Sequence, residues 1–265
     1  MKIVVSVVGI YIFLMGLMYI AQEKLIFFPE NLPEDYSFSF SASFEEVLIP
    51  VEDGQLHALA FEHPQALATI LYFHGNAGSL ASWGYVYEHF QSLPYNIFII
   101  DYRGYGKSDG QISSEAQLQQ DALAAYLSAK KRYPQSTFVF YGRSIGTGIA
   151  SWLATQHPPS MLILESPYFN LPTLVGDIYP FVPKFLVKYT LMNNVHISKL
   201  DIPIHLLHGT NDELIPFQHS ERLKNSCDKA QLHIIDGGGH NDLSLFAKYH
   251  KTIQKLLAPP KSTTP

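Results

Sequence analysis

The stretch TFVFYGRSIGTGIA, residues 137–150, decides the fold. Its apolar first half is typical of a buried strand, and its small residues from Gly146 onward suit the start of a packed helix. Gly142 and Gly146 flank Ser144 in a Gly-x-Ser-x-Gly pattern, and a strand that turns sharply into a helix needs residues without side chains at these two positions. We therefore predict that Ser144 is a nucleophile on a strand-turn-helix. The alternative is an ordinary glycine-rich turn in which Ser144 is only the helix N-cap.

Apolar runs of strand length recur on both sides of this stretch, and helix-length segments separate the later ones. This alternation predicts one α/β domain with a mostly parallel sheet of eight strands, flanked by helices. The expected strands are residues 45–51, 57–62, 68–73, 96–101, 137–141, 161–165, 202–208 and 231–236. The expected helices are residues 114–133, 144–157 and 242–257.

A nucleophilic serine on such a sheet needs an acid and a histidine on later loops, in that chain order. Asp212 follows the predicted strand at 202–208, and His240 follows the glycines at 237–239. We predict that His240 is the general base and that Asp212 orients it. Glu165 and Glu213 are the rival acids, but the loop of Asp212 immediately precedes the strand that leads to His240.

Two backbone amides are expected to stabilise a developing oxyanion. The first belongs to Ile145, at the start of the helix that follows the nucleophile. The second belongs to Asn76 or Ala77, in the glycine-containing loop after the strand at 68–73. His74, at the end of that strand, is expected to support the loop through hydrogen bonds rather than to transfer protons.

Composition narrows the possible partners. The chain has 18 Lys and Arg against 23 Asp and Glu, with a formal net charge of −5 and no basic block, so we expect no nucleic-acid binding. Its single cysteine, Cys227, excludes an internal disulfide and a multi-cysteine metal site. We expect neither a metal nor a cofactor.

Residues 3–21 carry no charge and are long enough, at about 1.5 Å per residue, to cross the hydrocarbon core of a bilayer. The alternative is a cleaved signal peptide, because Lys2 supplies a basic start. The length of the apolar stretch, and the bulk of Tyr19 three positions from a cut after Ala21, favour an uncleaved anchor. The positive charge at the N-terminus weakly predicts that the rest of the chain lies on the exoplasmic or periplasmic side.

The chain divides into a membrane anchor at residues 1–24, an interfacial linker at 25–43, a catalytic domain at 44–258 and a flexible tail at 259–265. The linker begins with LIFFP, which is expected to lie at the membrane surface. The alternative is that these side chains pack on the domain.

Residues 166–201 are expected to form a small cap, because only a short segment separates two predicted strands there. The cap is rich in aromatic residues, so it is expected either to line an acyl pocket and face the bilayer or to be a plain helix packed on the sheet. The candidate pocket residues are Tyr168, Phe169, Phe181 and Phe185.

Several motifs together resemble the α/β-hydrolase superfamily over about residues 44–257. They are HGNAG at 74–78, DYRGYGKSDG at 101–110, GRSIG at 142–146, HGTND at 208–212 and GGGH at 237–240. The resemblance implies an α/β-hydrolase fold and gives Asp101 and Arg103 structural roles, with Arg103 near the pocket. An apolar N-terminus followed by LIFFP and HGNAG resembles, more narrowly, membrane-tethered esterases, lipases and thioesterases.

The sequence thus predicts a serine hydrolase that cleaves carboxylic esters or thioesters, of lipid or acyl-protein type, through an acyl-enzyme on Ser144. One alternative is a serine peptidase on the same fold. The other is a non-catalytic, membrane-anchored binding protein on a hydrolase scaffold, which the intact set of three side chains disfavours.

Overall fold

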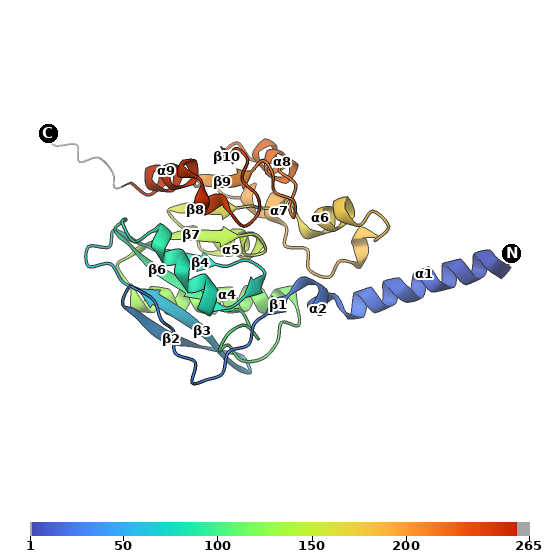
Figure 1. The fold of residues 1–265 in the computed structure, drawn as a ribbon, viewed down its shortest axis with the longest axis horizontal. Coiled ribbons are helices and arrows are strands. Elements are labelled where there is room, and N and C mark those ends of the chain that lie inside the picture. The colour runs from blue at the N-terminus through green and yellow to red at the C-terminus, as the bar shows by residue number, and fades with distance from the viewer. Residues whose placement is uncertain (1, 259–265) are drawn as a thin grey trace.

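The computed structural model describes residues 2–258 and shows an eight-stranded sheet at the centre of the domain (Figure 1). The expected tail at 259–265 lies outside the described residues. The strand order is β10-β9-β8-β7-β4-β6-β3-β2. The strands are β2 Phe44–Val51, β3 Gly54–Phe61, β4 Ala68–Phe73, β6 Tyr95–Ile100, β7 Thr137–Arg143, β8 Met161–Glu165, β9 Ile204–Gly209 and β10 Ala230–Ile235.

The strands from β10 to β6 pair in parallel, and β3 and β2 extend the sheet as an antiparallel edge. All six residues of β4 are buried, because this central strand is covered on both faces. The predicted sheet, mostly parallel and eight-stranded, is therefore confirmed. A second, two-stranded parallel sheet joins β1 Phe28–Pro29 to β5 Ala77–Gly78.

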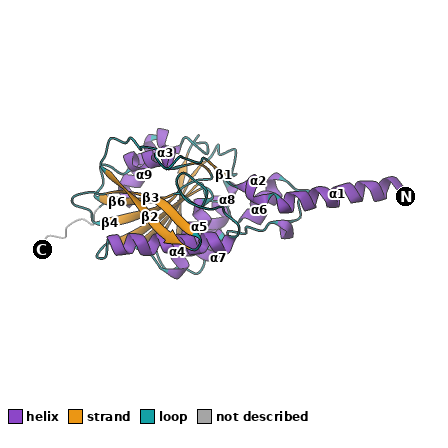
Figure 2. Cartoon of the chain, turned by 90° about the horizontal axis from the view of Figure 1, so that it is seen from below, coloured by secondary structure: helices purple, strands orange, loops and turns teal. Residues whose placement is uncertain are grey.

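Helices cover both faces of the large sheet (Figure 2). The helices of the described residues are α1 Lys2–Ile20, α2 Gln22–Ile26, α3 Leu80–Trp83, α4 Glu115–Arg132, α5 Gly146–Gln156, α6 Leu171–Ile178, α7 Asn193–Ile197, α8 Gln218–Ser226 and α9 Ala247–Leu256, with 3₁₀ turns η1 Gly84–His89, η2 Lys184–Leu186 and η3 Leu243–Leu245. Helix α4 begins where expected because the side chain of Ser114 accepts a hydrogen bond from the amide of Gln117.

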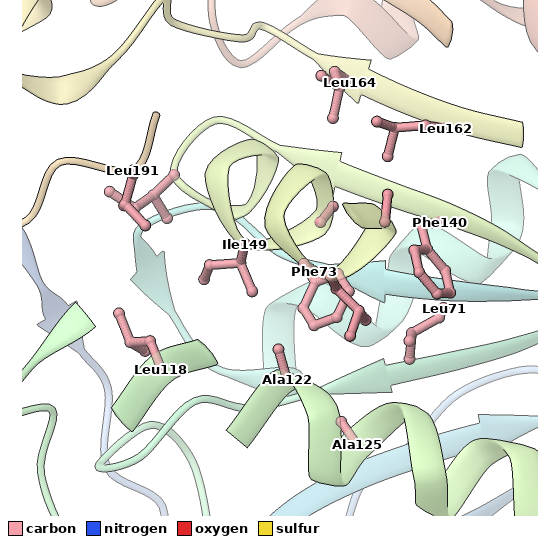
Figure 3. Close-up of a cluster of buried hydrophobic side chains, with 14 of the residues drawn as sticks. Leu71, Phe73, Leu118, Ala122, Ala125, Phe140, Ile149, Leu162, Leu164 and Leu191 are labelled. Atoms are coloured by element: carbon pink, nitrogen blue, oxygen red, sulfur yellow. The ribbon is translucent and has the colours of Figure 1, made fainter. Parts of the chain in front are cut away.

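Alternate side chains of the central strands pack into two separate cores, one on each face of the sheet. Leu71 and Phe73 of β4 point toward α4 and α5 and pack there with Ala122 and Ile149 (Figure 3). Their neighbour Tyr72 points to the other face, where η1 and α9 cover the sheet. The period of two along the strand thus lets one short segment serve both layers.

Helix α1 projects from the domain beside the cap (Figure 1). Its mean hydropathy of 2.5 and its 19 residues make it long and apolar enough to cross a membrane. Most of its side chains are exposed, but Met15 is buried against the rest of the chain. The segment expected to be a linker is also partly packed, since Phe27 and Phe38 belong to the two cores.

Candidate active site

Ser144 stands in the tight turn between β7 and α5. Its φ of 52° lies in the left-handed region, which a non-glycine residue adopts only at an energetic cost. A Cβ atom on Gly142 would lie 2.5 Å from the carbonyl oxygen of Gly146, and one on Gly146 would lie 2.2 Å from that of Phe73. Both glycines are therefore required for the strand and the helix to approach closely enough to form this turn.

His240 joins the serine to the acid. Its Nε2 lies 3.1 Å from Oγ of Ser144, and its Nδ1 lies 2.8 Å from Oδ2 of Asp212. Because a carboxylate only accepts hydrogen bonds, Nδ1 carries the proton and Nε2 is free to accept one from the serine hydroxyl. This is the tautomer that a general base requires.

Asp212 is buried after β9 and is held by several donors. The amides of Leu214 and Ile215 donate to its Oδ1 at 3.0 and 2.8 Å, while His208 and His240 donate to its Oδ2. Burial alone would raise the pKa of this carboxyl, but these hydrogen bonds lower it well below its ordinary value. Asp212 is therefore ionised at neutral pH and fixed in orientation.

His208 is a contact of the acid that the sequence did not identify. Its Nε2 faces two acceptors, Oδ2 of Asp212 at 3.1 Å and the carbonyl of Ile215 at 2.9 Å, so this nitrogen carries the proton. Its Nδ1 accepts from the hydroxyl of Ser220 at 2.6 Å. The histidine in HGTND, four residues before the acid, was the available signal, but sequence alone gives no reason to orient it toward Asp212.

The two rival acids occupy other positions. Glu165 is buried, and it accepts from the hydroxyls of Tyr141 and Tyr249 and pairs with Nε of Arg143 at 3.0 Å. Glu213 is exposed. The carboxylate that accepts the hydrogen bond from Nδ1 of His240 is that of Asp212.

Arg143, immediately before the serine, links the nucleophile turn to the loop of the histidine. Its guanidinium pairs with Glu165, donates to the carbonyl of His240 at 3.0 Å and to the side chain of Asn241 at 3.1 Å, and lies over the ring of Trp83. The planar guanidinium suits several fixed partners at once. This role could not be predicted from the sequence, since the position between Gly142 and Ser144 can be any residue in the Gly-x-Ser-x-Gly pattern.

The loop expected to complete the oxyanion site lies beside Ser144, where Gly75, Asn76 and Ala77 line the same cavity as Ile145. The segment after α2 supports this loop from outside, because β1 pairs with β5 in a register that sets Phe28 opposite Ala77.

The Tyr105 hydroxyl ties the two segments further together. It accepts from the amide of Phe28 at 3.2 Å and donates to the carbonyl of Asn76 at 2.6 Å. The segment that follows the apolar helix is thus a structural part of the site.

His74 and Asp101 support this loop from below. His74 is fully buried, with Nδ1 2.6 Å from the carbonyl of Gly75 and Nε2 3.3 Å from Asp101. Arg103 lies elsewhere: it forms a bidentate pair with Asp121 of α4, at 2.7 and 3.0 Å. The expectation that Arg103 lies near the pocket is therefore not met, because this pair holds its guanidinium against α4.

A cavity of about 840 Å³ opens over Ser144 and His240. Of the predicted pocket residues, Tyr168 lines this cavity, whereas Phe169, Phe181 and Phe185 are not among its lining residues. Phe169 instead packs under the guanidinium of Arg222, and the other two lie exposed at the cap tip. Apolar lining residues include Leu25 and Ile26 of α2 and Leu171, Leu174 and Ile178 of α6.

The residues that line this cavity offer amide, hydroxyl and imidazole groups, the guanidinium of Arg143 and one exposed carboxylate, that of Glu88. Within residues 2–258, no group of three or more His, Cys, Asp or Glu side chains is arranged to hold a metal ion. The arrangement has the parts for nucleophilic acyl transfer: a hydroxyl, a base oriented by a carboxylate, and amides near the hydroxyl.

Comparison with known proteins agrees with the fold. Residues 64–196 match the model of a family described as serine aminopeptidase, S33. Alpha/beta hydrolase domain-containing protein 17B of Xenopus laevis is 34% identical over 200 residues, covering 74% of this chain and 68% of that protein. An uncharacterized protein of Mycobacterium tuberculosis is 29% identical over 235 residues, covering 85% and 82%.

The solved structure of Pyrococcus furiosus esterase Pf2001 superposes with a TM-score of 0.68 at 19% identity, over 86% of this chain and 96% of that one. At this identity the likeness shows the fold alone. The predicted α/β-hydrolase fold is confirmed.

Proposed function

Because the chain belongs to the serine aminopeptidase S33 family of the α/β-hydrolase superfamily, and is therefore a hydrolase, we propose that it is a serine hydrolase of carboxylic esters or thioesters. The observation that carries the proposal is the placement of His240 between Ser144 and Asp212, at 3.1 and 2.8 Å. The substrates we propose are of lipid or acyl-protein type, because the cavity over Ser144 has an apolar wall.

The reaction begins when Oγ of Ser144 attacks the acyl carbon while Nε2 of His240 takes the serine proton. The negative charge that develops on the acyl oxygen is stabilised by the amide of Ile145 and by one amide of the Asn76–Ala77 loop. Asp212 stabilises the imidazolium, which then protonates the leaving alcohol or thiol as the C–O or C–S bond breaks. Water, deprotonated by the same histidine, releases the acid and restores Ser144.

The family description favours one rival, an aminopeptidase. Such an enzyme holds the ammonium of its substrate, and Glu88, at the cavity, is a carboxylate that could serve this purpose. Glu88 is exposed, however, and an ion pair in water contributes little to binding. Binding of an acyl chain against the apolar wall between Ser144 and α6 needs no ion pair, because burial of its methylene groups is favourable in itself.

The test compares purified full-length protein on p-nitrophenyl and thio esters with aminoacyl p-nitroanilides, with Ser144→Ala as the control. The proposal predicts turnover of esters and thioesters that Ser144→Ala lacks. Activity confined to the anilides and lost in Glu88→Gln would establish the aminopeptidase instead. Folded protein that turns over neither class would favour the binding-only alternative.

We also propose that α1 remains attached and anchors the domain on the exoplasmic or periplasmic face. The support is its length and hydropathy, together with its contacts to the cap. Intact mass of protein extracted from membranes tests the first part, because removal of residues 1–21 would shorten the chain measurably. Digestion of the domain by added protease in intact cells tests the second.

A further inference from the structure

The cap lies alongside the apolar helix α1. The Tyr11 hydroxyl, midway along α1, donates to the carbonyl of Phe181 at 2.8 Å. Just after α1, the Gln22 side chain donates to the carbonyl of Leu186 at 2.6 Å and accepts from the amide of Lys188 at 2.8 Å. The segment from Phe181 to Lys188 is therefore fixed to α1 at Tyr11 and to α2 at Gln22, and Figure 1 shows it as the loop beside the inner half of α1.

This contact sets a depth. Tyr11 precedes the end of α1 by about nine residues, or about 14 Å along the helix axis. A hydrocarbon core is about 30 Å thick. We call residues 178–186 the cap tip. If α1 crosses a bilayer, the cap tip beside Tyr11 must lie within the leaflet nearest the domain.

The cap tip has a surface that suits this position. Its exposed apolar side chains are Ile178, Tyr179, Phe181 and Phe185, which expose 45, 50, 59 and 85% of their area. Exposed apolar side chains grouped beside a membrane helix favour insertion into lipid. The charged residue at the tip, Lys184, lies with its aliphatic chain against Gly176 of α6, and a long side chain of this kind can extend its ammonium toward the interface.

Four backbone polar groups at the tip have hydrogen-bond partners, and such pairing lowers the cost of placing a backbone in lipid. The carbonyls of Phe181 and Leu186 accept from α1 and Gln22, as described above. Within the tip, the amide of Val182 donates to Tyr179, and the amide of Leu186 donates to Pro183.

The active-site cavity leads to this same region. It extends from Ser144 to Leu25 and Ile26 of α2 on one side and to Leu174 and Ile178 of α6 on the other. Helix α2 directly follows the anchor, and α6 leads into the cap tip. The cavity therefore connects the nucleophile to the two elements that border α1.

We propose that α2 and α6 form an acyl-chain site that opens to the bilayer, with the cap tip inserted beside α1, so that the acyl chain of a membrane-resident ester or thioester reaches Ser144 without leaving the lipid. This rests on the proposed function, because it assigns the acyl part of that substrate. The carbonyl to be attacked lies at Ser144, and the chain extends between Leu25 and Ile178 toward the hydrocarbon.

A first experiment places a larger side chain in the proposed acyl-chain site, from α2 in one variant and from α6 in the other. Leu25→Trp and Ile178→Trp are made in the full-length protein, together with Leu127→Trp on α4 as a control, because Leu25, Ile178 and Leu127 expose 53, 45 and 52% of their area. The ratio of kcat/KM for p-nitrophenyl dodecanoate to that for the acetate is measured. We expect this ratio to fall about tenfold or more in the two wall variants and to stay at the wild-type value in Leu127→Trp.

Unchanged ratios in both wall variants, with acetate turnover retained, would overturn the acyl site while leaving the hydrolase intact. Wild-type protein without activity on any ester would instead defeat the proposed function. The two failures are therefore distinguishable.

A second experiment measures how deeply the cap tip lies in the membrane and does not depend on enzymatic activity. Phe185→Cys and Leu67→Cys are made in a Cys227→Ser background and spin-labelled, and the protein is reconstituted in phospholipid vesicles. Leu67 is a suitable control because it immediately precedes β4, at the end of the parallel strands opposite that of Ser144, and exposes 52% of its area. We expect the label at 185 to be relaxed by oxygen and shielded from a water-soluble nickel complex, and the label at 67 to show the reverse. Equal access of the nickel complex to both labels would overturn insertion of the cap.

Discussion

The cavity over Ser144 has two walls of opposite character. One is built from the carboxyl ends of β7 and β9 and the loop after β10, where Ser144, Asp212 and His240 are buried or half-buried and joined by directed hydrogen bonds. The other is built from α2 and α6, whose side chains are apolar and, at Leu25 and Ile178, about half exposed. The first wall depends on bond geometry and the second only on shape and apolar area.

We infer from this difference that the first wall carries out the reaction and that the second selects the acyl chain. A hydrogen-bonded array in a buried site loses its function when one partner is removed, because the remaining groups are left misoriented or unpaired. An apolar wall tolerates exchange of one side chain for another of similar size. We therefore expect changes in the first wall to affect every substrate and changes in the second to affect only how the acyl chain is bound.

The largest effect is expected for Asp212→Asn. The amide cannot stabilise the imidazolium and favours the wrong tautomer of His240, so kcat should fall by about 10⁴ or more on short and long esters alike. Glu213→Gln is the control, because Glu213 is exposed on the same loop. A loss in Glu213→Gln with activity retained in Asp212→Asn would assign the acid to the neighbouring residue.

The two walls should also differ in how much an added methyl group changes the free energy of unfolding, and one glycine in each wall tests this. A Cβ on Gly146 would lie 2.2 Å from the carbonyl oxygen of Phe73, which is fixed in the sheet, so Gly146→Ala should lower the free energy of unfolding by about 3 kcal/mol or more. A Cβ on Gly176 of α6 would meet only the flexible chain of Lys184, so Gly176→Ala should be neutral or stabilising by up to about 1 kcal/mol. Urea denaturation measures both, and equal losses would show that α6 is as constrained as the nucleophile turn.

A smaller effect is expected for Arg143→Lys. A lysine cannot pair with Glu165 and hold the carbonyl of His240 together, so the loop of the base should shift slightly relative to Ser144. We expect kcat to fall about 10- to 100-fold for all chain lengths while KM changes little. A change in KM for long esters alone would place Arg143 with the substrate wall instead.

The stability of the fold in acid depends on histidines that lie outside the first wall. Burial lowers the pKa of His196, His205 and His219 to about 4. In the unfolded chain these groups bind protons below about pH 6.5, so folding stability is complete above that pH and declines as the pH falls toward 4, by up to about 1.4 kcal/mol per unit for each histidine.

His205→Gln should weaken this dependence of Tm on pH, whereas His63→Gln, at a partly exposed loop position, should not. Tm that stays constant from pH 7 to 4.5 would contradict the assignment of these histidines as neutral in the folded state.

Much of the first wall was predictable from sequence. The strands at residues 68–73 and 161–165 have the predicted bounds, because strands covered on both faces read as continuous apolar runs. The glycines around Ser144 carry a steric requirement that is visible in the sequence itself. The placement of Asp212 and His240 followed from chain order, and the geometry brings them together with the serine.

The second wall was not predictable in the same way. Leu25 and Ile26 lie in the segment expected to be a linker, and only the pairing of β1 with β5 brings that segment to the oxyanion loop. Phe181 and Phe185 were expected in the pocket because they are aromatic, but their direction depends on how the cap turns beside α1. The third expected helix begins at Ala247 rather than at 242, because the 3₁₀ turn Leu243–Leu245 precedes it. Contacts between segments far apart in the chain decide all of these features.

The reactivity of Ser144 tests the central claim most directly. A fluorophosphonate phosphonylates a serine that a neighbouring base activates, with release of fluoride. Wild-type protein should be labelled on the tryptic peptide that contains Ser144, and Ser144→Ala and His240→Ala should remain unlabelled while keeping the wild-type circular dichroism spectrum. Folded wild-type protein that resists the probe, or label that persists in Ser144→Ala, would contradict the account.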